Sequence, residues 1–378
     1  MNGEMHSIST MIPEYFPDQG HLFYFWKGRV ALYTILNAFH IGPGDEVILP
    51  GFTCVVVANA ILYLGATPVY ADIEPETYNL SVRTIEPLIT SRTRVILAQN
   101  TFGLSADLDP ILALANHHGL VVVEDCAHGL GGSYKNRPNG TVAHAAFFST
   151  QWSKPISTGL GGIAYIQDEA CAEQIEHLIR MIPPPTFPQQ LMLSAQRILR
   201  PFADHPLLHY ALIRCYRVLT QKFGFPVGSS TGQELTSIKK PPGYLKRMGR
   251  AQLRLWQRSL VPLAKIVKQR QQAAAIYDAY FDAIGLALPR RPAYADHAML
   301  RYPIRVANKP EILTKAQHFH IPLGDWFVSP LHPVGSDLQP WRYQQGQCPI
   351  AERACREVVN LFTDSPLSRR QLDRLFSK

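Results

Sequence analysis

Short apolar runs alternate with amphipathic segments along the first third of the chain. The amphipathic segments have helical spacing and cover residues 29–40, 55–65, 83–89 and 109–119. The runs between them are rich in Val and Ile and cover residues 46–49, 67–73, 94–100 and 120–126. Such strands alternating with helices of about ten residues indicate a mainly parallel sheet covered by helices on both faces. The pattern therefore predicts an α/β fold.

The pattern changes after residue 180. The stretch PPPTFP is a stiff break, and residues 207–223 then carry an apolar stripe opposite arginines, as expected of a helix. A long helical region at 249–284 leads to a C-terminal segment with a strand signal at 300–306 and a helix signal at 352–362. We therefore predict a large domain at residues 1–260 with an insertion at about 183–240. A smaller α+β domain would follow at residues 261–378.

Charge is concentrated in one part of the sequence. The chain of 378 residues has 46% hydrophobic residues and a formal charge of +8. Residues 180–270 contain 16 Lys and Arg but only Asp204 and Glu234 as acids, which gives +14 and leaves 8 − 14 = −6 for the rest. A basic block of this kind predicts an anionic partner, such as a phosphorylated substrate, a membrane surface or nucleic acid. A solvated helical face is an equally weighted alternative.

The remaining composition narrows the class of protein. No apolar run reaches 18 residues, and the N-terminus MNGEMHSIST lacks the pattern of a signal peptide. The six cysteines form no CxxC pair and have no histidines at zinc-ligand spacing. We expect free thiols in a reducing compartment, a cytoplasmic protein and no metal site.

Candidate chemistry lies at the ends of two predicted strands. In FFSTQWSKPISTGLGGIAYI (147–166), Lys154 stands between two strand signals beside a glycine-rich turn, and Asp125 closes the apolar run at 120–123. The carboxyl ends of parallel strands share one crevice, so the two side chains are expected to meet there. A lysine amine and a carboxylate suit pyridoxal phosphate, which needs a Schiff-base lysine and a partner for its pyridinium nitrogen. The alternative for Asp125 is a helix cap.

A longer match strengthens this hypothesis. The sequence resembles the DegT/DnrJ/EryC1/StrS family of pyridoxal-phosphate aminotransferases in IGPGDEVILPGFT, HHGLVVVEDCAHGLGGSYKNRPNG and SKPISTGLGG, and again in GYLKRMGRAQL and SPLHP. The resemblance implies the fold-type-I transferase architecture and a homodimer whose active sites are shared between chains. It places Lys154 at the Schiff-base lysine, Asp125 at the pyridine-nitrogen partner, Ser149 at the cofactor phosphate and His128 against the cofactor.

The sequence departs from the family pattern at the cofactor. Where the family has Ser-Gly-Thr at the phosphate, this chain has a lysine, Gly28 and Arg29, and Cys54 replaces the aromatic residue that stacks on the ring. In the GYNYRM motif, the asparagine and the second tyrosine are Leu245 and Lys246. We predict that Gly28, Arg29 and Lys246 bind the phosphate, because a guanidinium grips phosphate with two hydrogen bonds. The alternative is that both cations face solvent.

The resemblance implies a function as well as a fold. We expect the protein to transfer an amino group from glutamate to a nucleotide-linked keto sugar. The reaction would belong to glycan or secondary-metabolite biosynthesis. Nucleic acid is not expected as a partner. The basic insertion is expected either to pack on the protein or to contact the inner face of a membrane. Two alternatives stay open: another reaction with the same cofactor, and a binding or membrane-associated scaffold without activity.

Overall fold

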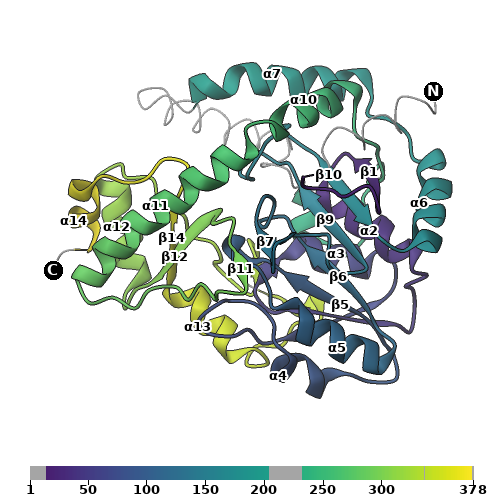
Figure 1. Cartoon of the computed structure of the whole chain (residues 1–378), viewed down its shortest axis with the longest axis horizontal. Helices are drawn as coiled ribbons and strands as arrows, with labels where there is room; N and C mark the ends of the chain where they lie inside the picture. The colour runs from purple at the N-terminus through teal and green to yellow at the C-terminus, as the bar shows by residue number, and fades with distance from the viewer. Residues whose placement is uncertain (1–13, 204–231, 336, 377–378) are drawn as a thin grey trace.

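The computed structural model describes residues 14–203 and 232–376 except residue 336, and within residues 198–203 only the backbone. Its centre is a seven-stranded sheet in the order β1-β10-β9-β6-β5-β2-β4 (Figure 1). The strands are β1 (His21–Phe25), β2 (Glu46–Pro50), β4 (Thr67–Ala71), β5 (Thr93–Gln99), β6 (Val121–Asp125), β9 (Ala145–Ser149) and β10 (Gly162–Ile166). The five strands from β9 to β4 are parallel, while β10 is antiparallel to both β9 and β1.

Helices cover both faces of this sheet, as predicted. One face packs on α2 (Gly28–Ala38), α3 (Val55–Leu62) and α6 (Glu169–Met181), and the other packs on α4 (Val82–Ile85) and α5 (Leu108–His118) (Figure 1). Strand β2 shows why both faces need cover: Val47 and Leu49 lie in the first core and Ile48 in the second. A strand buried on both sides reads as a continuous apolar run.

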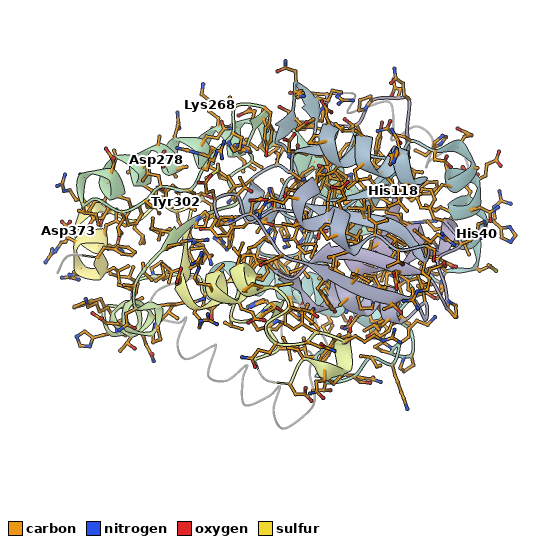
Figure 2. The ribbon with its side chains drawn as sticks, turned by 90° about the horizontal axis from the view of Figure 1, so that it is seen from below. His40, His118, Lys268, Asp278, Tyr302 and Asp373 are labelled. Carbon is orange, nitrogen blue, oxygen red and sulfur yellow. The ribbon has the colours of Figure 1, made fainter. Side chains whose placement is uncertain are left out.

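A second group of elements follows in the C-terminal part of the chain. It contains α11 (Leu263–Ala283), α12 (Lys309–His318), α13 (Pro349–Glu357), α14 (Arg369–Phe376) and the antiparallel pair β12 (Arg301–Arg305) and β14 (Val358–Phe362). Helices α12 and α14 form one end of the molecule in Figure 1, while α13 lies closer to the central sheet. The Tyr302 hydroxyl donates to Asp278 Oδ1 at 2.8 Å, which ties β12 to α11 (Figure 2). The predicted helix at 352–362 is wrong in its second half, because Val358–Phe362 is a buried strand.

The long predicted helix at 249–284 is divided. It forms α10 (Arg250–Leu260) and α11, and Pro262 is the N-cap residue of α11. This break falls at the predicted domain boundary near residue 260, although the division into two domains stays a prediction. The predicted helix at 207–223 lies outside the described residues. Of the insertion, the structure describes α7 (Phe187–Ala203) and α9 (Gly232–Thr236).

Short elements bring distant segments together. Strand β3 (Thr53–Cys54) pairs in parallel with β13 (Leu331–His332), so a C-terminal loop lies against the end of the central sheet. The other short pieces are η2 (Glu86–Leu88), η3 (Thr101–Gly103), β7 (Ser133–Tyr134), β8 (Arg137–Pro138), β11 (Ala295–Asp296) and η4 (Gln339–Trp341). Within the described ranges, no helix is both long and apolar enough to cross a membrane.

Candidate active site

A cavity of about 260 Å³ opens at the carboxyl ends of the parallel strands. Strand β6 ends at Asp125 and β9 ends at Ser149, and the two strands are hydrogen-bonded neighbours. The structure brings seven of the eight predicted residues to this cavity: Gly28, Arg29, Cys54, Asp125, His128, Ser149 and Lys154. The eighth, Lys246, does not line it; its Nζ donates to Gln189 Oε1 of α7 at 2.8 Å.

Lys154 lies in the turn that joins β9 to β10. Thr150 N donates to Gly161 O at 3.0 Å and Thr158 N donates to Thr150 O at 2.9 Å, which closes the turn at its base. A Cβ at Gly161 would lie 2.1 Å from Thr150 Oγ1, so a side chain there would displace the threonine hydroxyl. Burial lowers the pKa of Lys154 to about 8, with Arg301 and Arg29 adding to the effect and Cys54 and Asp125 opposing it.

Asp125 is buried and ionised at neutral pH. Burial raises the pKa of Asp125 to about 6, while the Ala127 N–H and the charge of Lys154 oppose the rise. The Ala127 N–H donates to Asp125 Oδ1 at 2.9 Å. This bond orients the carboxylate at the floor of the cavity, beside Lys154.

The first turn of α2 forms another wall. Its N-cap residue, Lys27, forms no side-chain capping bond within the described part of the chain. A Cβ at Gly28 would lie 3.1 Å from Ser149 Cβ, so the helix start packs closely on the end of β9. A helix N-terminus beside a hydroxyl suits an anion such as phosphate. Arg29, however, donates from Nη1 to Glu234 Oε1 at 2.6 Å.

Two stacked aromatic side chains line another part of the cavity. The rings of His128 and Trp326 are stacked, with centroids 5.2 Å apart and planes 9° from parallel. The Phe102 N–H donates to His128 Nδ1 at 3.3 Å, which places the proton of the neutral ring on Nε2. Burial lowers the pKa of His128 well below its ordinary value, and Lys154 and Arg301 add to this effect. The imidazole is therefore neutral.

Arg301 of β12 is a buried cation that the sequence did not single out. Its Nε and Nη1 atoms have no hydrogen-bond partner in the described ranges, and its guanidinium carbon lies 5.2 Å from the Trp326 ring centroid. Asp364 Oδ1 is 4.0 Å from Nη1. In the sequence, RYPIRV reads only as a strand, and Trp326 reads as a core or interface residue. Neither carries a local signal of the cavity.

The side chains present fit pyridoxal phosphate. A lysine with a lowered pKa, an ionised carboxylate, a planar neutral imidazole and an uncapped helix N-terminus beside Ser149 line one cavity. Within the described ranges, no group of three or more His, Cys, Asp or Glu side chains is placed to hold a metal ion.

Comparison with known proteins gives an independent result. The model of the DegT/DnrJ/EryC1/StrS aminotransferase family matches residues 14–191 and 208–378. GDP-perosamine synthase of Caulobacter vibrioides is 42% identical over 152 residues, which are 40% of this chain and 41% of that protein. UDP-N-acetyl-3-dehydro-alpha-D-glucosamine 3-aminotransferase of Acidithiobacillus ferrooxidans is 28% identical over 351 residues, which are 92% of this chain and 80% of that protein.

Solved structures agree on the fold. An aminotransferase from Psychrobacter cryohalolentis aligns with a TM-score of 0.74 at 22% identity, covering 99% of this chain and 89% of its own. A DegT DnrJ EryC1 StrS aminotransferase from Brucella abortus aligns with a TM-score of 0.73, also at 22% identity, covering 98% and 88%. The predicted fold class is confirmed.

Proposed function

Because the chain belongs to the DegT/DnrJ/EryC1/StrS aminotransferase family, we propose that it moves an amino group from glutamate to a nucleotide-linked keto sugar. Pyridoxal phosphate would be the cofactor. The observation that carries this proposal is the meeting of Lys154 and Asp125 in one cavity beside the uncapped start of α2. The relatives named for GDP-perosamine and for a UDP-linked amino sugar support the substrate class.

Each side chain has a task in such a reaction. When bound, pyridoxal phosphate supplies a carbonyl for the lysine amine and an electron-withdrawing ring. The lowered pKa of Lys154 leaves its Nζ partly unprotonated at neutral pH, so this atom can act as a nucleophile and then accept a proton. The ionised Asp125 stabilises a proton on a ring nitrogen. Ser149 and the first turn of α2 hold the phosphate.

The test is spectroscopic. The purified protein, supplied with pyridoxal phosphate, should show the visible absorption of the lysine-bound cofactor, and Lys154→Ala should lose it. Lys135→Ala is the control, since Lys135 is half-exposed and paired with Asp109. Glutamate should bleach the band, and one member of a panel of nucleotide-linked keto sugars should restore it. A band that survives in Lys154→Ala would refute the assignment, and a protein that never binds the cofactor would support a non-catalytic scaffold.

The proposal extends to partners and place. We propose a homodimer with shared active sites, as the family resemblance implies, and a large domain at 1–260 followed by a small one at 261–378. The five described cysteines are free, which suits the cytoplasm. We propose further that the basic residues of α10 and α11 contact the inner surface of a membrane. Exposed cations on α10 and α11 support this contact: Arg250, Arg254, Arg258, Lys265 and Lys268.

A further inference from the structure

Three charged side chains meet at the start of α2. Glu234 Oε1 accepts from Arg29 Nη1 at 2.6 Å, and Glu234 Oε2 accepts from Lys27 Nζ at 3.2 Å. The exposed fractions of the side chains are 2% for Glu234, 6% for Arg29 and 16% for Lys27. Charges this deeply buried are costly unless they are paired, so the three depend on one another. We call Lys27, Arg29 and Glu234 the buried triad.

A hydrogen bond to its backbone carbonyl holds Glu234 in this place. Asn59 Nδ2 of α3 donates to Glu234 O at 2.7 Å, and Asn59 Oδ1 accepts from Trp341 Nε1 at 2.6 Å. The next residue, Leu235, lines the cavity. The carboxylate therefore reaches the two cations from a segment that is itself part of the cavity wall.

The sequence makes this contact unusual. Residues 180–270 carry 16 Lys and Arg and two acids, of which Glu234 is one. An acid in such a basic segment would be expected to form ion pairs with the cations of its own segment near the surface. Glu234 is instead buried against cations contributed by residues 27 and 29, at the start of α2.

From this geometry we infer that Glu234 is an internal counter-anion at the phosphate end of the cavity, and that a phosphate group binding there competes with it for Arg29 and Lys27. Lys27, Gly28 and Arg29 all line the cavity at the uncapped N-terminus of α2. This place favours the binding of one anion, either the Glu234 carboxylate or a phosphate. Burial and the charge of Arg29 lower the pKa of Lys27 to about 8, and Glu234 opposes this lowering. The carboxylate thus keeps Lys27 charged until a phosphate takes over that role.

If Glu234 and phosphate compete, removing the Glu234 charge should lower the stability of the protein and raise its affinity for phosphate. In Glu234→Gln, the two cations lose their buried partner, so the melting temperature without added anion should fall. The same variant should bind inorganic phosphate about tenfold more tightly, or better, because no carboxylate has to be displaced. The probe is inorganic phosphate, followed by the rise in melting temperature against its concentration.

Controls separate this role from a purely structural one. Glu76→Gln breaks an ion pair to Arg290 of 2.8 Å that is exposed, so phosphate should act on it as on the wild type. If Glu234→Gln binds phosphate no better than the wild type, or more weakly, the inference is wrong. Inorganic phosphate is not an amino acceptor, so this test gives the same answer whether or not the protein is an aminotransferase. Identifying the natural anion as the cofactor phosphate rests on the proposed function.

A second measurement uses the unchanged protein, in case Glu234→Gln does not fold. Displacement of Glu234 should loosen α9 and the exposed residues that follow it, Lys239 and Lys240. Trypsin should therefore cut between these two lysines faster when inorganic phosphate or pyridoxal phosphate is present, and pyridoxal without the phosphate should have no such effect. Equal or slower cutting with phosphate would overturn the competition.

Discussion

At the scale of single residues, the reactivity of Lys154 depends on the charges around it. Burial, Arg301 and Arg29 together lower the pKa of Lys154 to about 8 from an ordinary 10.5. The rate at which the cofactor-free protein combines with pyridoxal phosphate should therefore rise with pH, with a midpoint near pH 8 and a plateau above it. Stopped-flow absorbance across a pH series measures this rate.

The charge of Arg301 provides a check on that interpretation. Arg301→Gln removes a cation that disfavours protonated Lys154, so the midpoint of the rate profile should move to higher pH. Arg369→Gln changes an exposed cation on α14 and should leave the midpoint in place. A wild-type midpoint near 10.5 would show that Lys154 is solvated and does not have the role assigned to it.

Asp125 should show opposite effects on activity and on stability. Asp125→Asn cannot hold a pyridinium proton, so the bleaching of the visible band by glutamate should slow by about 10²–10³-fold.

Burial raises the pKa of Asp125 from 3.8 to about 6, so this carboxyl ionises at a lower pH in the unfolded chain than in the folded protein. Wild-type stability is therefore lost as pH rises from 3.8 to 6, and Asp125→Asn should be more stable at pH 7 by about 3 kcal/mol. Urea unfolding of the cofactor-free proteins measures this difference.

Below pH 3.8 the two proteins should converge in stability, because Asp125 is then protonated in both the folded and the unfolded chain. Asp109→Asn serves as the control, since this carboxylate is half-exposed and pairs with Lys135. If Asp125→Asn kept normal turnover, Asp125 would be no more than a local backbone cap through Ala127 N.

Local sequence signals explain which site residues were predictable. Asp125 ends one recognisable strand and Lys154 lies in the turn after a neighbouring one, so their meeting follows from the parallel sheet. The sequence predicts Arg29 at the phosphate. Its ion pair with Glu234 joins residues 205 positions apart, so no local sequence pattern indicates it. Trp326 lies in the segment before β13, which is held at the cavity by the pairing of β13 with β3. The sequence pattern does not indicate this pairing.

At the scale of elements, α7 supports the turn that carries Lys154. Leu193 is 3% exposed, and a Cβ at Gly159 would lie 2.7 Å from Leu193 Cδ1 and 2.9 Å from Trp152. Leu193→Ala should therefore cost about 2–3 kcal/mol of unfolding free energy, the low end for a buried leucine, and should weaken retention of the cofactor. Urea unfolding and the visible absorbance after gel filtration measure the two effects.

The same helix offers a matched control. Leu191 is two residues away and 59% exposed, so Leu191→Ala should change stability by no more than about 0.5 kcal/mol. If both substitutions behave alike, then α7 does not brace the turn.

Elements with a strong period were predictable, and those defined by pairing were not. The strands at 46–49, 67–73, 94–100 and 120–126 all appear, because strands buried on both faces are long apolar runs. For strand β14 the sequence pattern predicts the end of a helix, because VVNLF continues the apolar spacing of α13 and only the pairing with β12 separates them. Strand β1 was not predicted, and its five residues are fixed by β10.

At the scale of the whole molecule, five cations from residues 180–270 lie exposed on two successive helices. Helix α10 presents Arg250, Arg254 and Arg258 at a spacing of four residues. Helix α11 continues with Lys265 and Lys268, of which Figure 2 labels Lys268. None of the five forms an ion pair with another described residue. We call these five cations the basic stripe.

Apolar side chains lie near this stripe. Helix α7 runs beside α10 (Figure 1), where Gln190 lies close to Gly249, and it exposes Phe187 and Leu191. Exposed apolar residues next to unpaired cations are typical of a surface that rests on an anionic membrane. We therefore predict that the protein floats with anionic vesicles at low salt and remains at the bottom of the gradient at high salt, where charges are screened.

Charge reversal is the sharpest test of this surface. Deleting residues 187–232 would also remove Gln189 and Leu193, which touch Lys246 and the Gly159 turn and so disturb the cavity. Reversing Arg254, Arg258 and Lys265 to Glu should leave the cavity intact and weaken vesicle binding about 100-fold or more, at about 1 kcal/mol for each cation removed. The matched variant reverses three exposed arginines on α13 and α14: Arg353, Arg369 and Arg370. If both variants lose vesicle binding equally, then net charge, and not the basic stripe, attracts the vesicles. If the wild-type protein never floats, the stripe is a solvated face.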